Sequence, residues 1–208
     1  MNQKRMVCFV YAFLVFMFMG MNPDQLFAQE IPGELVFDEP FEGELIPGWI
    51  IVQQRGATAE NLGLIETGPN GGDALVLLST TPAGVTLNNL QYTNEESLVR
   101  PEDSDLYDWW VTFWIHVRTI PFTIRPIIAM NVDPWSGSDV DVPIEQAEVW
   151  TFVDTILPGQ PFLTTDPLLF IFHMGNPGDA NGENEIWLDD LKVYLLNQET
   201  GVNDWSIY

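Results

Sequence analysis

The sequence predicts an all-β protein, an antiparallel β-sandwich of the jelly-roll kind. From Glu34 onward the chain is a series of short apolar runs separated by Gly, Pro, Asn and Asp residues. No stretch keeps a helical period of apolar residues over three turns. About ten short strands within one domain's length of chain are typical of two packed antiparallel sheets. Since no internal repeat or domain boundary is visible, we expect one binding domain over residues 34–196.

The predicted strands are bounded by turn residues, as in Pro69–Gly72 (PNGG) and Asn176–Asp179 (NPGD). The segments 133–141 and 176–185 are predicted to be loops. From the N-terminus, the predicted strands are Leu35–Asp38, Trp49–Gln53, Gly63–Glu66, Ala74–Ser79, Val85–Tyr92, Trp109–Arg118, Pro126–Val132, Glu148–Asp154, Leu168–Met174 and Glu185–Leu196.

The N-terminus has the three-part pattern of a secretory signal peptide. Lys4 and Arg5 form a positive region, residues 7–20 are almost wholly apolar, and a polar stretch then offers a cleavage point after Ala28. We therefore expect residues 1–28 to be a leader, and the protein to be secreted from a bacterium, either extracellular or at the cell surface.

Composition excludes several classes of partner and site. The apolar leader run is shorter than the roughly 20 residues that span a bilayer, so membrane insertion is not expected. Cys8 is the one cysteine and would leave with the leader, so neither disulfides nor thiolate metal sites are expected. The chain has 7 basic and 30 acidic residues, a net charge of −23. Such a polyanion repels nucleic acid and acidic membranes, and suits cation binding or a saline medium.

The predicted strand Trp109–Arg118 (WWVTFWIHVR) is the most informative segment, because strand residues alternate between two faces. One face is wholly apolar and suits the core: Trp109, Val111, Phe113, Ile115 and Val117. The other face combines two indoles with hydrogen-bond donors: Trp110, Thr112, Trp114, His116 and Arg118. Indole faces stack on pyranose rings and polar neighbours bind sugar hydroxyls, so this face predicts a sugar platform. Alternatively, loops cover it and its tryptophans pack a second small core.

Three further aromatic residues and one histidine bear on this site. Trp150 and Phe152 share a face of one predicted strand, and either extend the platform or belong to the core. Trp135 lies in the predicted loop 133–141, where it could gate a ligand or cover the core. His173 lies in an apolar strand and is interpreted as an interior histidine rather than a ligand.

Three segments in order resemble a known group of proteins. They are Phe37–Trp49 (FDEPFEGELIPGW), Gly71–Leu75 (GGDAL) and Glu185–Val193 (EIWLDDLKV). This order resembles the calcium-containing jelly-roll carbohydrate-binding modules, of galactose-binding-like fold, attached to bacterial xylanases and glucanases. The opening segment is also similar to that of cleaved-adhesin domains of surface proteins. The resemblance implies a polysaccharide or cell-surface glycan as the ligand.

The same resemblance implies a structural Ca²⁺ ion that joins the first and last strands. The matching positions are Glu42, Asp73 and Asp189, with Asp190 as a substitute. Calcium takes about six to eight oxygen ligands from carboxylates and backbone carbonyls, which these positions could supply. The alternative is that all four are ordinary surface acids of an acidic protein.

The tail over residues 197–208 (NQETGVNDWSIY) is polar and follows the last predicted strand. It is similar to the linker that precedes the C-terminal sorting domain of the bacterial type IX secretion system. The alternative is an ordinary frayed C-terminus.

Catalytic motifs are lacking. The sequence has no G-x-S-x-G and no H-E-x-x-H. Glu185 and Asp189 lack the third acid of jelly-roll glucanases, and His116 and Arg118 lack the strand motifs of polysaccharide lyases. We therefore expect a non-catalytic carbohydrate-binding domain. The alternatives are an adhesin or structural domain with a protein or self-association partner, and, less favoured, a polysaccharide-degrading enzyme.

Overall fold

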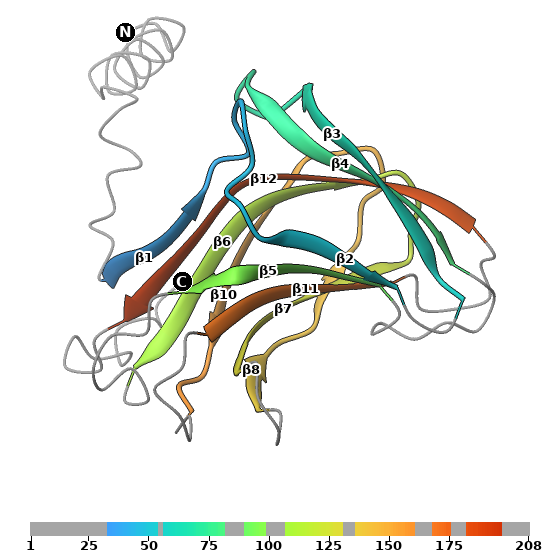
Figure 1. Ribbon diagram of the computed structural model, residues 1–208. Helices are drawn as coiled ribbons and strands as arrows, with labels where there is room; N and C mark the ends of the chain where they lie inside the picture. The colour runs from blue at the N-terminus through green and yellow to red at the C-terminus, as the bar shows by residue number, and fades with distance from the viewer. Residues whose placement is uncertain are drawn as a thin grey trace, which may run out of the picture. The chain divides into compact units, whose positions relative to one another are not determined.

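The computed structural model describes most of the predicted domain, which consists of strands and turns (Figure 1). The described residues are 33–53, 56–81, 90–98, 107–130, 136–160, 168–175 and 182–196. They form two antiparallel sheets and no helix, which confirms the predicted all-β sandwich. No helix in this part of the chain is long and apolar enough to cross a bilayer. The predicted leader and the predicted tail lie outside the described residues.

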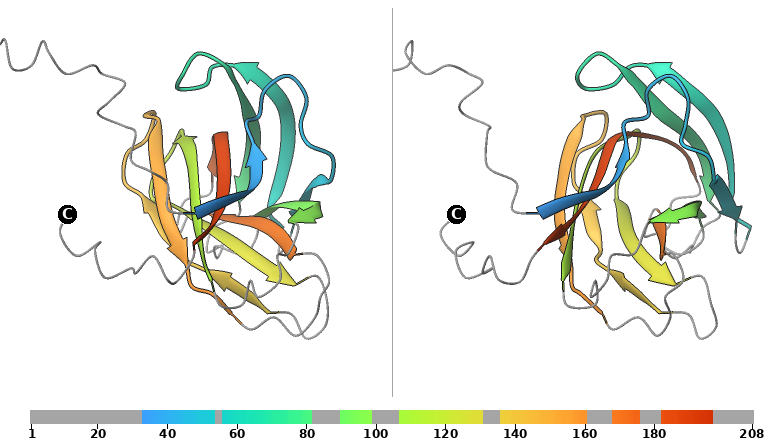
Figure 2. Two further views of the ribbon diagram at one scale, coloured as in Figure 1. Left: turned by 90° about the vertical axis from the view of Figure 1, so that its left-hand side faces the viewer. Right: turned by 60° about the vertical axis from the view of Figure 1, so that its left-hand side comes forward.

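Sheet A contains both the first and the last strand, which pair with each other. Its order is β10-β6-β12-β4-β3, with β1 also beside β12 (Figures 1 and 2). The bounds are β10 Thr151–Leu157, β6 Asp108–Val117, β12 Gly182–Leu196, β4 Asp73–Thr81, β3 Thr58–Glu66 and β1 Gly33–Glu39.

Sheet B contains the intervening strands in the order β2-β5-β11-β7-β8, with β9 also pairing with β7. The bounds are β2 Trp49–Gln53, β5 Leu90–Leu98, β11 Leu168–Gly175, β7 Phe122–Met130, β8 Gly137–Asp139 and β9 Val142–Ile144. The first and last strands lie in one sheet, so both ends of the described domain lie in sheet A.

The sequence-based strands differ from the observed ones in several places. Strand β3 starts at Thr58 rather than Gly63, and β7 starts at Phe122 rather than Pro126. Strand β12 starts at Gly182, inside the predicted loop 176–185.

The three-residue strand β8 lies within the predicted loop 133–141, and β9 lies in no predicted strand, because three residues are too few to show alternation. Strand β5 runs on through the polar residues 93–97, which pairing with β2 and β11 holds in the sheet. Strand β10 starts at Thr151 rather than Glu148, whose φ of 58° is not that of a strand residue.

The core lies between the sheets and confirms the alternation predicted for β6. Each of its five apolar residues at alternate positions is fully buried: Trp109, Val111, Phe113, Ile115 and Val117. From sheet B, Phe172 packs edge-on against Phe113, with ring centroids 4.8 Å apart. The first face of β6 is therefore used for packing, and its second face is left for other roles.

A buried carboxylate at the end of β1 links sheet A to sheet B. Glu39, at the end of β1, is fully buried. It accepts hydrogen bonds from the Phe41 N–H (3.1 Å), the Ile46 N–H (2.9 Å) and Trp49 Nε1 (2.8 Å). Trp49 then stacks on Tyr92 of β5, with centroids 4.4 Å apart and planes 5° from parallel. Glu39 thus organises the loop that leads from sheet A into sheet B.

Replacing Glu39 by alanine should lower the free energy of unfolding by roughly 3 kcal/mol or more, because each unsatisfied buried donor costs about 1–3 kcal/mol. Glu39→Gln should cost less, since its amide keeps one acceptor oxygen. Urea unfolding measures both. The matched control is Glu60, an exposed acid on β3, whose alanine variant should stay within about 0.5 kcal/mol of the parent. Equal losses at Glu39 and Glu60 would contradict this role.

Candidate functional site

The outer face of sheet A carries a row of aromatic side chains. It starts from the second face of β6 and continues onto the strands on either side. The strand register places Trp114 opposite Phe152 of β10, and His116 opposite Trp187 of β12. We call the following set the aromatic strip: Trp110, Trp114, His116, Trp150, Phe152, Trp187 and Tyr194.

The rings of the strip touch in three groups along β6. Trp110 packs on Tyr194, with centroids 5.1 Å apart. Trp114 packs on Phe152 at 5.0 Å. At the far end His116 stacks on Trp187 at 4.6 Å, and Trp150 lies 6.0 Å from Trp187. The four tryptophans are partly exposed and Phe152 is 49% exposed, so the strip is open to solvent in part.

Acidic side chains hold two of the indoles. Trp110 Nε1 donates a hydrogen bond to Asp154 of β10. Trp187 Nε1 donates to Glu185 Oε1 at 2.6 Å, and Glu185 also pairs with the Arg118 guanidinium at 3.6 Å. These bonds fix ring orientation and line the strip with carboxylates, which accept hydrogen bonds from hydroxyl groups.

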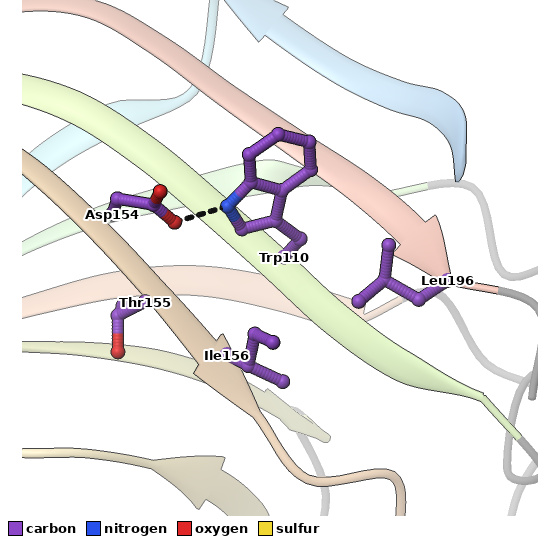
Figure 3. Close-up of a pocket in the computed structure, with 5 residues that line it drawn as sticks. All are labelled: Trp110, Asp154, Thr155, Ile156 and Leu196. Atoms are coloured by element: carbon purple, nitrogen blue, oxygen red, sulfur yellow. Dashed lines mark hydrogen bonds between the residues drawn. The ribbon is translucent and has the colours of Figure 1, made fainter. Parts of the chain in front are cut away.

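An open pocket lies beside Trp110 at one end of the strip (Figure 3). Its volume is about 360 Å³. The lining residues come from three adjacent strands: Trp110, Asp154, Thr155, Ile156 and Leu196. The pocket thus combines an indole, a carboxylate and two apolar walls.

His116 occupies the other end of the strip as a neutral imidazole. Burial lowers its pKa, while a hydrogen bond to the Glu148 backbone and the charges of Glu185 and Glu148 act in the opposite direction. Its Nδ1 is buried and has no hydrogen-bond partner in the described part of the chain. An uncharged ring suits stacking in an aromatic group.

The structure brings together most, though not all, of the predicted ligand-binding residues. Trp110, Trp114 and His116 lie on the strip, and Trp150 joins it from just before β10. Arg118 lies past the end of β6, paired with Glu185. Trp135 lies outside the described residues.

Sequence analysis missed Trp187 and Tyr194. They stand at odd and even positions of one strand, so simple alternation puts them on opposite faces. A register shift between Asp189 and Lys192 moves both to the outer face. No local sequence signal locates this bulge, although the positive φ of Asp190 (50°) belongs to it.

A second group of oxygens lies where the loop after β1 meets the start of β4. Glu42 Oε2 accepts from the Asp73 N–H, and Asp73 Oδ2 accepts from the Gly43 N–H, both at 3.1 Å. A β-carbon on Gly72 would lie 1.7 Å from Glu42 Oε1, so only glycine allows this approach. Glu42 and Asp73, two of the positions matched by the resemblance, are thus neighbours in the structure.

Asp189 of β12, the last strand, lies close to the same loop. A β-carbon on Gly68 would lie 2.7 Å from Asp189 Oδ2, 3.0 Å from the Asp73 carbonyl oxygen and 3.1 Å from the Gly72 carbonyl oxygen. Two carbonyls and a carboxylate therefore surround one point beside Gly68. We call the oxygens of Glu42, Gly72, Asp73 and Asp189 the acidic cluster.

Any cation held by the acidic cluster would need backbone carbonyl oxygens as ligands in addition to carboxylates. Among the described residues no three His, Cys, Asp or Glu side chains form a ready set of metal ligands. Asp190, the predicted substitute, is engaged elsewhere, because its carboxylate pairs with Lys192. Asp189 is 4% exposed, and burial raises its pKa to about 6, with the charges of Asp190 and Glu42 adding to the rise. An additional positive charge at this point would relieve that cost.

The outer face of sheet B is a further, more enclosed surface. Ile127, Ala129, Leu169 and Ile171 form a buried cluster there, separate from the main core. Beside it His173 is 7% exposed, as predicted for an interior histidine, and lies opposite Arg125 in the register. Burial, together with the Arg125 charge, lowers the pKa of His173 to about 4. His173 Nδ1 and Thr93 Oγ1 have no hydrogen-bond partner within the described residues.

No family model and no curated protein sequence matches this chain. Several solved structures are similar to it. The CBM22-1 xylan-binding domain of Xyn10C from Paenibacillus barcinonensis is similar with a TM-score of 0.53 and 11% identity, over 79% of this chain and 96% of that chain. The family 11 carbohydrate-binding module of the cellulase Lic26A-Cel5E of Clostridium thermocellum has a TM-score of 0.51 and 15% identity, over 81% and 96%.

A third similar structure joins a module to an enzyme. It contains the CBM22-1 and GH10 modules of the Clostridium thermocellum endo-1,4-β-D-xylanase 10B complexed with xylohexaose. Its TM-score is 0.50 and its identity 11%, over 78% of this chain and 29% of that chain. At such identities the likeness concerns the fold alone. The chain has a β-sandwich fold of the kind found in carbohydrate-binding modules.

The raised pKa of Asp189 predicts a pH dependence for the metal-free protein. The folded state holds this proton up to about pH 6, whereas the ordinary value is 3.8. The contribution of Asp189 to the free energy of unfolding should therefore fall as pH rises from about 4 to 6. Asp189→Asn should remove that fall and stabilise the protein at pH 7 by at most about 3 kcal/mol. Urea unfolding in chelator at both pH values measures this, and identical pH profiles for parent and variant would contradict it.

Proposed function

We propose that this protein is a non-catalytic carbohydrate-binding β-sandwich that holds a polysaccharide on the aromatic strip. The observation that carries the proposal is the partly exposed row of aromatic rings on sheet A, held in place by carboxylates. Exposed aromatic surface on a folded protein marks sites that bind a ligand or partner. A sugar ring offers a flat apolar face to stack on the indoles and hydroxyls to bond the acids.

The strip is long enough for an oligosaccharide. From Trp110 to His116 it spans six residue steps of β6, about 20 Å. The comparisons support a sugar ligand to the extent that one similar structure is described as xylan-binding and another is complexed with xylohexaose. The carboxylates of Asp154 and Glu185 favour a neutral glycan over an acidic one, because Arg118 is already paired.

A second location for the same ligand is the outer face of sheet B. The buried atoms His173 Nδ1 and Thr93 Oγ1 favour it, since unpaired buried polar groups are rare and mark sites where a ligand or water completes the bonding. The strip on sheet A remains the better candidate because its rings are already open to solvent.

Secretion and the absence of catalysis belong to the proposal as well. The predicted leader supports export, and the lack of catalytic motifs supports a binding role. The alternative, a surface adhesin with a protein partner, would use the same exposed aromatic surface without affinity for sugar.

Replacing both Trp110 and Trp114 by alanine should abolish retardation of the protein in gels containing neutral β-glucan or xylan. The melting temperature should fall modestly, because both indoles are partly exposed; a fully buried tryptophan would cost about 3–5 kcal/mol. The double variant Thr93→Val with His173→Ala, on sheet B, is the matched control and should retain binding. Loss of binding only in the sheet B variant would move the site to that face.

We also propose that the acidic cluster holds a structural Ca²⁺ ion. The support is chemical, because carboxylate and carbonyl oxygens are the ligands that calcium prefers. The Asp189 carboxylate and the carbonyls of Gly72 and Asp73 lie beside Gly68, and the Glu42 carboxylate lies beside Gly72. The ion would bind the loop after β1 to β12 and offset the cost of the buried Asp189 charge. Glu42 and Asp189 would supply side-chain oxygens, and Gly72 and Asp73 would supply carbonyls.

Chelation should lower the melting temperature, and added calcium should restore it. At a calcium concentration about a hundredfold above the dissociation constant, the free energy of unfolding should rise by about 2.7 kcal/mol. The neighbours Asp189 and Asp190 make a matched pair of variants. Asp189→Asn should abolish the calcium response, and Asp190→Asn should keep it. The reverse pattern would assign the ligand role to Asp190. An unchanged melting temperature of the parent in chelator would leave the cluster as ordinary acids.

A further inference from the structure

Strand β10 is an open edge of sheet A. Within the described residues it pairs with β6 alone, and the left view of Figure 2 shows it as the outermost strand of the sheet. Its seven residues keep one unbroken register with β6, from Thr151 opposite Ile115 to Leu157 opposite Trp109. The other side of this strand therefore presents a regular row of backbone donors and acceptors.

The remaining described edge strands are shorter or less regular. Strand β2 of sheet B keeps an unbroken register with β5 but has only five residues. Strand β3 has a register shift between Asn61 and Gly63, and β1 has one between Leu35 and Phe37. Strands β8 and β9 have only three residues each. Bulges, short lengths, proline and charged side chains, lysine above all, are the usual means of blocking an edge. Of these, β10 has only the charged side chain of Asp154. The unpaired backbone edge of β10 is therefore a candidate site for pairing with another strand.

The side chains on β10 indicate what kind of strand fits. On the outer face Phe152 (49% exposed), Asp154 and Ile156 (37% exposed) alternate as apolar, acidic and apolar. Residues directly opposite on a neighbouring strand would contact these three. The complementary pattern is apolar, basic and apolar.

The pocket beside Trp110 fits the basic residue of that pattern (Figure 3). Asp154 supplies a carboxylate, Trp110 an indole, and Ile156 and Leu196 apolar walls around about 360 Å³. The aliphatic stem of lysine or arginine packs on apolar walls, while its charged head binds a carboxylate and an aromatic ring.

We propose that β10 is a docking edge for an extended basic peptide segment of another protein. The segment adds to sheet A as a further strand and places a lysine or arginine in the pocket between Trp110 and Asp154. The net charge of −23 favours a basic partner and opposes a second copy of this chain. The backbone edge and the pocket carry this proposal, and it shares Trp110, Phe152 and Asp154 with the proposed glycan surface.

The test uses a capped nine-residue peptide of alternating threonine and valine with a central lysine, titrated by calorimetry into the intact protein. Saturable binding is expected. A peptide with central glutamate, and one with alternate backbone nitrogens methylated on one edge, should bind at least about tenfold more weakly. In the protein, Asp154→Asn should weaken binding of the lysine peptide about tenfold, because it removes the carboxylate charge. Asparagine can still accept the hydrogen bond from Trp110, so the pocket should keep its shape. Ile156→Lys should abolish binding by placing a cation at the edge.

The matched control is Glu60→Gln, which removes the same charge from the opposite edge strand of the same sheet and should leave affinity unchanged. No binding of the lysine peptide would overturn the proposal. So would equal affinity for the methylated peptide, or equal weakening by the Asp154 and Glu60 variants. If the protein alone sediments as a dimer that Ile156→Lys converts to a monomer, the occupant is a second copy and the proposal is wrong.

Discussion

The buried carboxylate of Glu39 is the constraint on which the connection between the two sheets depends. It ends β1 in sheet A and accepts from Trp49 Nε1 at the start of β2 in sheet B, so one side chain couples the two layers. Its bonds to the N–H groups of Phe41 and Ile46 shape the loop between them. That loop carries Glu42 to the start of β4. The acidic cluster therefore depends on Glu39, although Glu39 is not part of it.

The bulge in β12 is the second decisive feature, because it sends consecutive acids to different places. Asp189 turns toward Gly68 and joins Glu42 and Asp73, whereas Asp190 pairs with Lys192. The same shift lets Trp187 and Tyr194 share one face with the aromatic residues of β6. A single irregularity thus contributes to the proposed metal site and to the proposed glycan surface, which lie on one strand of sheet A.

Acidic charge has a specific use in the aromatic strip. Asp154 and Glu185 each accept a hydrogen bond from an indole, so the rings are oriented before any ligand arrives. The remaining lone pairs of these carboxylates face the same surface and suit hydroxyl or ammonium donors. The two proposals, a neutral sugar along β6 and a basic strand at the β10 edge, therefore draw on the same carboxylates.

The sequence by itself determined the fold class and one face of the site. Period-two alternation in β6 depends only on backbone geometry, so it correctly separated Trp109, Val111 and Phe113 in the core from Trp110 and Trp114 outside. That the first and last strands lie close together was implied only by the resemblance to carbohydrate-binding modules. What only the tertiary structure decided depends on long-range register: the bulge that brings Trp187 and Tyr194 to the strip, the three-residue strands β8 and β9, and the burial of Glu39. The bulge arises from pairing with β6, which is distant in sequence. Strands β8 and β9 form only through pairing with β7, and Glu39 is held by three donors from the segment that follows it. None of these contacts is encoded by a local alternation pattern.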